Sequence, residues 1–483
     1  MLTTLPTGEG WWLVVWGIFR HSLMFSFSRS PLGCRFPKPI KSSFFVALAL
    51  HWLTAWANAA SAEVSLTSPE AVGFSAVRLE RLDVVMRQAV DDGEYAGVVT
   101  LVARHGKLIH FKAYGKSDLA TSAAMERDAI FRINSITKPI TAAAMMLLYE
   151  EGKWNPQDPI AKFIPQFADL KIYKGTGPTG SLQVEDPAHL PTMAELMTHT
   201  AGFGDGGGLS PVERLYRGEG DQYLFLCGSL QKMIDRLSKA PLLYQPSTQW
   251  AYGVSSEIQG YVIEKLSGQT LPRFLKDRLF GPLRMTDTDF YVPTQKRSRF
   301  ATLYTMGTQE KLVATDLAAY GLTYDGEPGF PSGGAGLVST AMDYFRFAQM
   351  LLNGGELDGV RVLSPQTIKL MISNHLPESL MTPFQGGGYQ FIKPRPGVGY
   401  GFGGAVLTDS VKADMPMGNG SYLWDGASGA WFWIDPTYDI VFVGMTQRIG
   451  WGWSRQAHVL GMPTNLEELS RATVYQALLR PER

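Results

Sequence analysis

The chain has 483 residues, and its 44 basic and 44 acidic side chains give a net charge of zero. This balance argues against nucleic acid as a partner, because contacts to phosphates need a basic surface. The eight histidines are scattered and no H-E-x-x-H or C-x-x-C pattern occurs, so we expect neither a metal nor another cofactor.

Residues 1–62 have the features of an N-terminal extension and a targeting segment. Lys38 and Lys41 precede the apolar run 44–50, and two small-x-small sites follow in residues 57–62. The order of these features is typical of a bacterial signal peptide. The sequence therefore predicts an exported protein, located in the periplasm or secreted.

Two points about this segment stay open at the level of sequence. A retained membrane anchor is the competing interpretation, although the apolar run is short for a span and His51 interrupts it. The aromatic residues before Met24 are unusual at the start of a signal peptide. Either Met24 is the true start, or the chain from Met1 carries a further extension.

From residue 63 onward the chain has the patterns of folded structure. Two runs of β-forming residues, 98–103 and 108–113, flank His105-Gly106, which is a hairpin signal. Near the other end, Thr464 to Glu467 match a capping box that opens a helix. The inward residues that we expect on the helix before the hairpin and on the C-terminal helix are Leu79, Leu82, Met86, Ala89 and Val90, and Leu466, Leu469 and Leu478.

The most informative motif is the tetrad Ser135-Ile136-Thr137-Lys138. The apolar stretch 141–149 after it is strongly helical, so Ser135 should lie at or near a helix N-terminus, where the helix dipole favours a developing alkoxide. The i,i+3 spacing places the Lys138 amine beside the Ser135 hydroxyl. Burial would lower the proton affinity of that amine and make it a base. A capped helix start with a solvated lysine is the alternative reading of an isolated motif of this kind.

Two further stretches carry candidate site residues. Tyr252 lies on a turn before a predicted helix that ends at Gly268, although a core aromatic residue would suit the same position. Trp424-Asp425-Gly426-Ala427 leads into the predicted strands 430–435 and 440–445. An edge strand with small residues at a bulge would also explain its glycine.

These three elements, in this order, resemble the β-lactamase-related serine hydrolases. That family includes class C β-lactamases, D-alanyl-D-alanine carboxypeptidases and family VIII-type esterases. The resemblance runs from about Pro69 to Leu478 and includes the stretches 196–203 and 333–343. It implies catalysis by Ser135, Lys138 and Tyr252 and no cofactor. It also implies an oxyanion hole made by the N–H groups of Ser135 and Ala427. The substrate-binding residues that it implies lie on one strand and are Trp424, Asp425, Gly426 and Ala427.

The expected fold class is α+β, an antiparallel β-sheet flanked by helices with an inserted mainly helical part. The periodic elements suggest it, and the resemblance implies the same. Residues 1–62 would precede a single hydrolase domain, 63–483. Its sheet part would comprise about 63–130 and 390–483, and its helical part about 131–389.

The chain departs from the penicillin-directed members at three positions. Val254 stands where they have the amide of Tyr-x-Asn, and Trp424 stands where they have the cation of Lys-Thr-Gly. Asp425 would add a negative charge that repels the carboxylate of a β-lactam. We therefore expect an esterase that acts on small neutral acyl esters. The alternatives are an acyltransferase, a β-lactamase or carboxypeptidase, and a non-catalytic binding protein.

Two other apparent motifs are not expected to be functional. Gly399 to Gly404 match G-x-G-x-x-G, but neither a buried strand precedes them nor a periodic helix follows. His199 could serve as a triad base, yet a hydrogen-bonded loop histidine is the favoured interpretation. The partner of the protein is then a small acyl substrate, and the oligomeric state is left open.

The signal peptide gives the first testable prediction. Signal peptidase should cut after Ala59 or Ala62, because both follow a small-x-small pattern. N-terminal sequencing of the exported protein should therefore begin at Ala60 or Glu63. An intact N-terminus on protein that remains in the cytoplasm would contradict the assignment.

Overall fold

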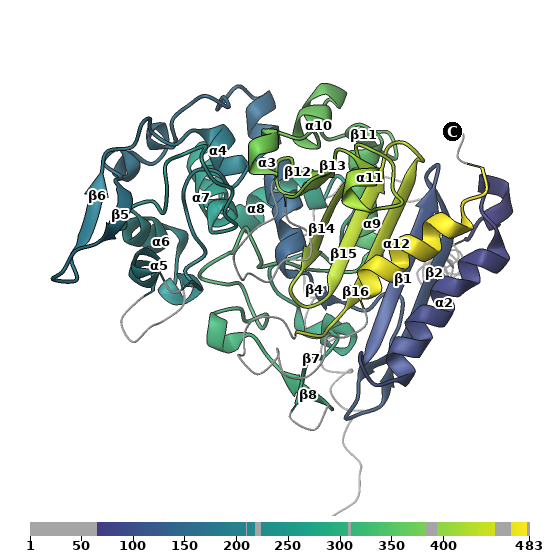
Figure 1. Cartoon of the computed structure of the whole chain (residues 1–483). Helices are drawn as coiled ribbons and strands as arrows, with labels where there is room; N and C mark the ends of the chain where they lie inside the picture. The colour runs from purple at the N-terminus through teal and green to yellow at the C-terminus, as the bar shows by residue number, and fades with distance from the viewer. Residues whose placement is uncertain are drawn as a thin grey trace, which may run out of the picture. The chain divides into compact units, whose positions relative to one another are not determined.

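The computed structural model describes residues 65–208, 210–217, 224–307, 311–381, 394–449 and 465–480. The predicted signal peptide lies outside these residues. Within them, no helix combines the length and the apolar character that crossing a bilayer requires. Figure 1 shows the arrangement of the elements.

An eight-stranded antiparallel sheet forms the centre of the structure, in the order β12-β13-β14-β15-β16-β1-β2-β3. The two ends of the domain build it together, because β1 pairs with β16 through partners such as Leu101 and Val443. The strands are β1 Gly97–Arg104, β2 Lys107–Asp118, β3 Ala123–Ala124, β12 Val398–Tyr400, β13 Ala405–Leu407, β14 Tyr422–Gly426, β15 Ala430–Asp435 and β16 Ile440–Thr446.

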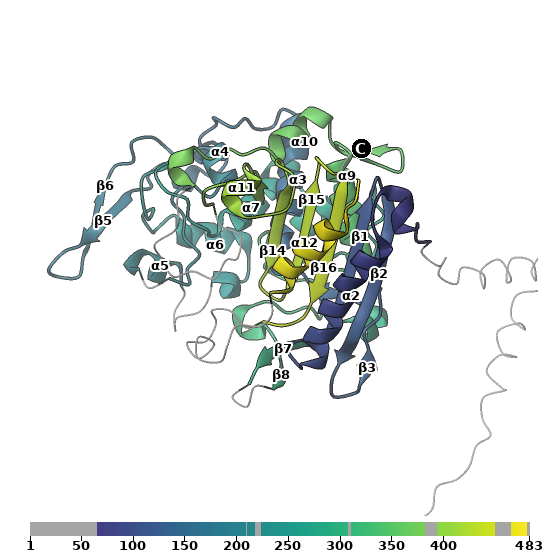
Figure 2. The same cartoon turned by 45° about the vertical axis from the view of Figure 1, so that its right-hand side comes forward.

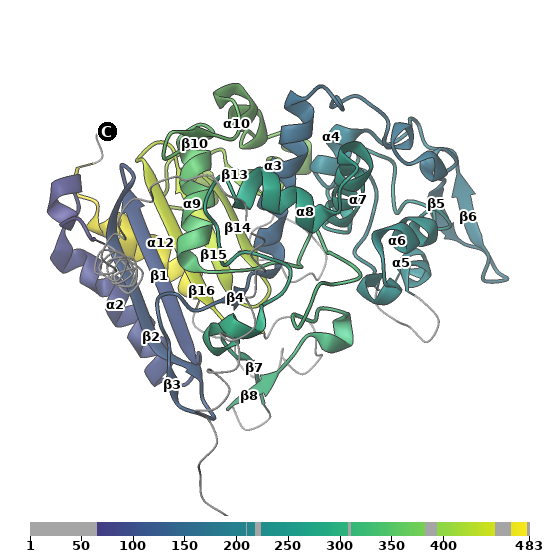
Figure 3. The same cartoon turned by 180° about the vertical axis from the view of Figure 1, so that it is seen from behind.

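Helices cover both faces of the sheet. On one face lie α2, Ala76–Asp91, and α12, Leu466–Ala477, which also contact each other (Figure 2). On the other face α9, Ala341–Leu352, packs against β1, β15 and β16 (Figure 3). Since both faces are covered, every residue of β1 is buried, including the polar Thr100 and Arg104.

The predicted β1–β2 hairpin is confirmed. His105 and Gly106 form its two-residue turn with φ angles of 53° and 67°, the left-handed values that a type I′ turn needs. In the C-terminal helix two expectations are wrong, because Leu469 is 37% exposed and the cap is made by Asn465 with Glu468 rather than by Thr464 with Glu467. The helix starts at Leu466 with Asn465 as its N-cap, so its buried face follows Leu466, Ser470 and Val474.

The remaining helices and small hairpins lie mainly between β3 and β12 in sequence. The helices are α3 Thr137–Glu150, α4 Met193–Met197, α5 Pro211–Tyr216, α6 Leu230–Leu237, α7 Ser255–Ser267, α8 Leu271–Leu275, α10 Pro365–Met371 and α11 Ser410–Ala413. The short strands are β4 Phe131–Arg132, β5 Ile172–Thr176, β6 Leu182–Glu185, β7 Leu303–Met306, β8 Leu312–Thr315, β9 Val338–Ser339, β10 Glu356–Leu357 and β11 Val360–Arg361.

This arrangement confirms the predicted α+β fold class. In the helical part α3 packs against α7, which brings together the two stretches that contain Ser135 and Tyr252. The helix α9 packs on the sheet, although the sequence assigns its residues to the helical part. Tyr344 of α9 contacts Phe432 of β15, and the centroids of the two rings lie 4.9 Å apart.

A buried histidine links β2 to β1 and α2. The Nε2 atom of His110 lies 2.8 Å from Thr100 Oγ1, and its Nδ1 lies 3.7 Å from Asp83 Oδ1. Burial lowers the pKa of His110 to about 4, and the neighbouring Asp83 carboxylate offsets only part of this effect.

This histidine predicts a loss of stability in acid. Between pH 6.5 and about 4 the unfolded chain binds a proton at His110 that the folded chain does not, so the free energy of unfolding falls as the pH is lowered through that range. The full effect is about 3 kcal/mol. Urea unfolding at pH 7, 5.5 and 4.5 should show a shallower loss for His110→Gln than for the wild type. Identical pH dependence in the two proteins would disprove this role.

Candidate active site

Ser135 lies in the 3₁₀ turn η2, Asn134–Ile136, which runs directly into α3. The turn begins with Asn134 at a φ of 41°, a left-handed conformation that asparagine tolerates better than most residues. The expectation that Ser135 lies next to a helix N-terminus is therefore confirmed. Its side chain is half-buried, so a small substrate can reach the hydroxyl.

The side chains of Ser135, Lys138 and Tyr252 converge. The Tyr252 hydroxyl donates a hydrogen bond of 2.7 Å to Ser135 Oγ, and Lys138 Nζ lies 3.4 Å from the same oxygen. The Lys138 amine also lies 4.5 Å from the centroid of the Tyr252 ring. Two groups that can exchange protons thus face one hydroxyl.

Lys138 is 4% exposed, as the apolar surroundings in the sequence predict. Its amine donates a hydrogen bond of 2.8 Å to the Gly334 carbonyl, a partner that no pattern in the sequence indicates. Removal from water makes an ammonium costly unless it is hydrogen-bonded. The carbonyl therefore both satisfies the amine and fixes its direction.

The strand β14 runs close to the nucleophile turn. A Cβ atom on Gly426 would lie 2.3 Å from the Ile133 carbonyl oxygen, so only glycine fits there. Since β13 pairs only with Tyr422 and Leu423 of β14, the rest of that edge is free of sheet partners among the described strands. The exposed Ala427 follows directly.

Ser428 ties this strand end to the residues around the nucleophile. Its hydroxyl donates a hydrogen bond of 2.8 Å to the Arg132 carbonyl and another to Asn134 Oδ1. Gln447 Nε2 donates to the same Arg132 carbonyl at 3.0 Å. Neither Asn134 nor Ser428 was predicted from the sequence, although an asparagine directly before the Ser135 tetrad was an available signal.

Trp424 and Asp425 point to opposite faces of the sheet. Trp424 pairs across β15 with Phe432, which contacts α9, and its ring lies 5.9 Å from the ring of Tyr252. Asp425 pairs with Trp431, whose Nε1 donates to Ser470 of α12. Successive strand residues alternate in this way.

The predicted repulsion between Asp425 and an anionic substrate is therefore not supported by this geometry. The Asp425 carboxyl lies on the α12 face, where its Oδ2 atom is buried without a hydrogen-bond partner. Burial and the negative charge of Glu467 raise the pKa of Asp425 well above its usual range. A carboxyl group that lies on the α12 face, away from Ser135, is not placed to repel a substrate there.

The other two departures from the penicillin-directed pattern lie where the sequence analysis placed them. Val254 is 2% exposed and precedes α7, and its side chain offers no hydrogen bond. Trp424 is fully buried, so its ring packs against the ring of Tyr252 and does not form an exposed wall of the substrate site.

His199 belongs to a cluster of aromatic rings around Tyr252. Its imidazole stacks on the Tyr252 ring at a centroid distance of 5.1 Å, and it also contacts Trp250 and Tyr400. The prediction of a hydrogen-bonded histidine is wrong, because both ring nitrogens are buried without a partner. Burial and the charge of Lys138 lower the pKa of His199 to about 3, and neither ring nitrogen is hydrogen-bonded to Ser135, so the geometry does not support a triad base here.

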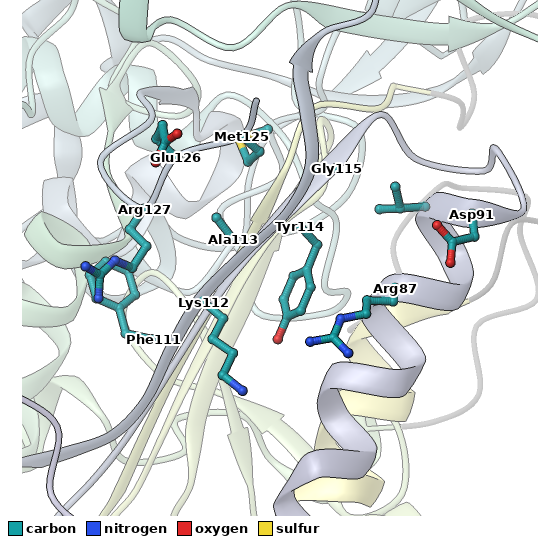
Figure 4. Close-up of a pocket in the computed structure, with 11 residues that line it drawn as sticks. Arg87, Asp91, Phe111, Lys112, Ala113, Tyr114, Gly115, Met125, Glu126 and Arg127 are labelled. Atoms are coloured by element: carbon teal, nitrogen blue, oxygen red, sulfur yellow. The ribbon is translucent and has the colours of Figure 1, made fainter. Parts of the chain in front are cut away.

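A separate hollow of about 600 Å³ lies between β2, α2 and the residues after β3. Figure 4 shows Arg87 and Asp91 of α2 on one side of β2, and Glu126 and Arg127 on the other. None of Ser135, Lys138 and Tyr252 lines it. The hollow therefore contributes nothing to the chemistry at Ser135.

Comparison with known proteins agrees with the fold. The chain is 34% identical over 368 residues to protein Rv1367c of Mycobacterium tuberculosis, covering 75% of this chain and 88% of that protein. It is 30% identical over 395 residues to esterase EstB of Burkholderia gladioli, covering 78% and 91%. The structure of EstCE1, a hydrolase with promiscuous acyltransferase activity, is similar with a TM-score of 0.65 and 27% identity, covering 83% and 99%.

A model of one protein family matches most of the folded domain. The match covers residues 82–460 and bears the description Beta-lactamase. It includes the strands of the central sheet and all the residues that meet at Ser135. The chain therefore belongs to the beta-lactamase family of serine hydrolases.

Proposed function

We propose that the protein is a carboxylic-ester hydrolase that acts on small neutral acyl esters through an acyl-enzyme at Ser135. The observation that carries this proposal is the convergence of the Tyr252 hydroxyl and the Lys138 amine on Ser135 Oγ. The similarity to esterase EstB and to the hydrolase EstCE1 supports the choice of an ester as substrate.

Acylation begins when Lys138 and Tyr252 together take the proton of Ser135. The alkoxide oxygen then attacks the carbonyl carbon of the ester and forms a tetrahedral intermediate. When that intermediate collapses, the bond to the alcohol oxygen breaks and Tyr252 returns a proton to the leaving alcohol. The acyl group remains on Ser135 as an ester.

The negative oxygen of the intermediate needs donors that are already in place. We assign this role to the backbone N–H groups of Ser135 and Ala427. The hydrogen bonds from Ser428 to Arg132 and Asn134 hold the two segments together. Water then attacks the acyl-enzyme in a hydrolase. An added alcohol would take the acyl group in an acyltransferase, a second activity that EstCE1 combines with hydrolysis.

The preference for neutral esters follows from the residues around Tyr252. Trp424 supplies an apolar ring where the penicillin-directed members have a cation, and Val254 lacks an amide. A substrate carboxylate would therefore lose a charge-assisted hydrogen bond, which is worth about 1.5–3 kcal/mol. A neutral acyl ester needs only the nucleophile and the oxyanion hole.

Removal of either proton-transfer group should reduce ester hydrolysis strongly. Ser135→Ala should abolish the hydrolysis of p-nitrophenyl butyrate, because no nucleophile remains. Lys138→Ala and Tyr252→Phe should each lower kcat/KM by roughly 10²–10⁴, the usual effect of losing a general base. His199→Phe should keep most of the activity, because its neutral ring only packs against Tyr252.

Each variant should first be shown to unfold as cooperatively as the wild type, so that a loss of kcat/KM cannot be caused by misfolding. If Ser135→Ala kept most of the activity, Ser135 would not be the nucleophile. A pH–rate profile that Lys138→Ala leaves unchanged would show that Lys138 accepts no proton.

Substrate selectivity provides a second test. The wild type should prefer p-nitrophenyl butyrate to nitrocefin in kcat/KM. Trp424→Lys should shift this ratio toward nitrocefin about tenfold, because the new ammonium can meet the carboxylate of the β-lactam.

Two matched variants separate charge from packing. Trp424→Phe keeps an apolar ring without a charge, and Asp425→Asn removes the carboxyl on the α12 face. Neither should change the ratio. A wild type that prefers nitrocefin, or an Asp425→Asn variant that gains β-lactam turnover as Trp424→Lys does, would refute this account of selectivity.

A further inference from the structure

The position of the Lys138 amine depends on a loop that lies outside the catalytic motif. Its hydrogen bond to the Gly334 carbonyl, at 2.8 Å, is shorter than its 3.4 Å contact with Ser135 Oγ. The shorter contact sets where the amine points. Whatever fixes Gly334 therefore also fixes the distance from the amine to the nucleophile.

The loop that contains Gly334 is wedged between the two helices of the site. From α3, the Thr141 hydroxyl donates to the Gly333 carbonyl at 2.6 Å. From α7, the Ser256 carbonyl oxygen would lie 2.4 Å from a Cβ atom on Gly333. The contact leaves no room for a side chain, so the loop cannot shift without moving α3 or α7.

Glu257 lies directly behind the carbonyl that binds Lys138. Its side chain is 2% exposed, and a Cβ atom on Gly334 would lie 2.3 Å from its Oε1 atom. The Ser332 hydroxyl donates to Glu257 Oε1 at 2.8 Å and accepts a hydrogen bond of 3.0 Å from the Ala335 N–H. The carboxyl group thus anchors the loop at Ser332, and the Ser332 hydroxyl in turn holds Ala335 on the other side of Gly334.

The place of Glu257 on α7 suits a negative charge. It lies in the first turn of the helix, where the positive end of the helix dipole favours an acidic side chain. This turn directly follows Tyr252. One short segment therefore supplies the tyrosine and the carboxyl group that supports the partner of Lys138.

We propose that Glu257 is a positioning residue for Lys138. Through Ser332 it holds the Gly334 carbonyl against the amine, and its negative charge favours the ammonium that forms when the proton of Ser135 reaches Lys138. The proposal rests on the proposed function, in which Lys138 is a proton acceptor. Glu257 itself touches neither the nucleophile nor the substrate.

The other titratable groups near Lys138 are compatible with this role. Tyr252 faces the amine from the turn before α7, and the neutral His199 stacks on that tyrosine. Asp425 lies on the far side of β14 with a raised pKa. Glu257 is the acidic side chain that the described residues place against the amine's carbonyl partner.

The test compares Glu257→Gln and Ser332→Ala with the matched control Glu264→Gln. Glu264 is also on α7, where it accepts a hydrogen bond of 3.0 Å from the Leu271 N–H, away from Gly334. For each protein, kcat and KM for p-nitrophenyl butyrate are measured from pH 5 to 9, together with the rate of labelling by a fluorophosphonate.

Glu257→Gln keeps an acceptor for Ser332 and removes the charge. It should lower kcat about tenfold with KM within twofold, and it should move the acid limb of kcat/KM to lower pH by about one unit, because an ammonium without a nearby carboxylate loses its proton more readily. Ser332→Ala should lower kcat by a similar factor without moving that limb. Glu264→Gln should change neither quantity.

Each outcome decides the proposal. A folded Glu257→Gln variant with wild-type kcat and a wild-type acid limb overturns it, and so does a loss of kcat that only follows the unfolded fraction. If Glu257→Gln does not fold, unchanged kcat in Ser332→Ala overturns it. A wild-type protein that no fluorophosphonate labels would instead refute the proposed function, which separates the two failures.

Discussion

Burial of the Lys138 amine beside Ser135 is the interaction around which the rest of the site is arranged. A lysine with 4% exposure needs partners that replace water. It finds them in the Gly334 carbonyl, the Ser135 hydroxyl and the face of the Tyr252 ring. These groups come from three segments of the chain, so the fold must bring all three to one point before the serine can be activated.

The central sheet supplies the fourth segment and holds it rigidly. Its strands come from both ends of the domain, and β14 approaches the nucleophile turn so closely that Gly426 cannot carry a side chain. Alternation along β14 then separates two neighbouring residues. Trp424 supports Tyr252, whereas Asp425 lies under α12. One face of β14 therefore contributes the ring of Trp424 to the apolar surroundings of Tyr252.

Local patterns predicted the fold class and placed Ser135 and Lys138 together at a helix start, whereas the role of Tyr252 was implied by the family resemblance. The turn at His105-Gly106 and the helix after Ser135 are examples of such patterns. Contacts between distant segments were not predictable in this way. No spacing links Lys138 to Gly334, or Ser428 to Asn134. The glycine-rich stretch 399–404 is a further example. Its G-x-G-x-x-G pattern alone suggests a nucleotide-binding site, whereas in the structure Gly403 packs against the Lys138 backbone.

The orientation of Asp425 and the environment of His199 were the two errors of interpretation at the site. Both needed knowledge of tertiary neighbours, because a strand residue can face either side and a loop histidine can stack rather than hydrogen-bond. In each case burial shifts the pKa toward the neutral form, upward for the Asp425 carboxyl and downward for the His199 imidazole.

The central claim is that Ser135 Oγ is the atom that carries the acyl group. The most direct measurement is peptide mapping by mass spectrometry after brief reaction with an activated ester and acid quench. The account predicts one added acyl group on the peptide that contains Ser135, and none in Ser135→Ala. An acyl group on another residue, or ester turnover without any covalent adduct at Ser135 under conditions that trap the intermediate, would contradict it.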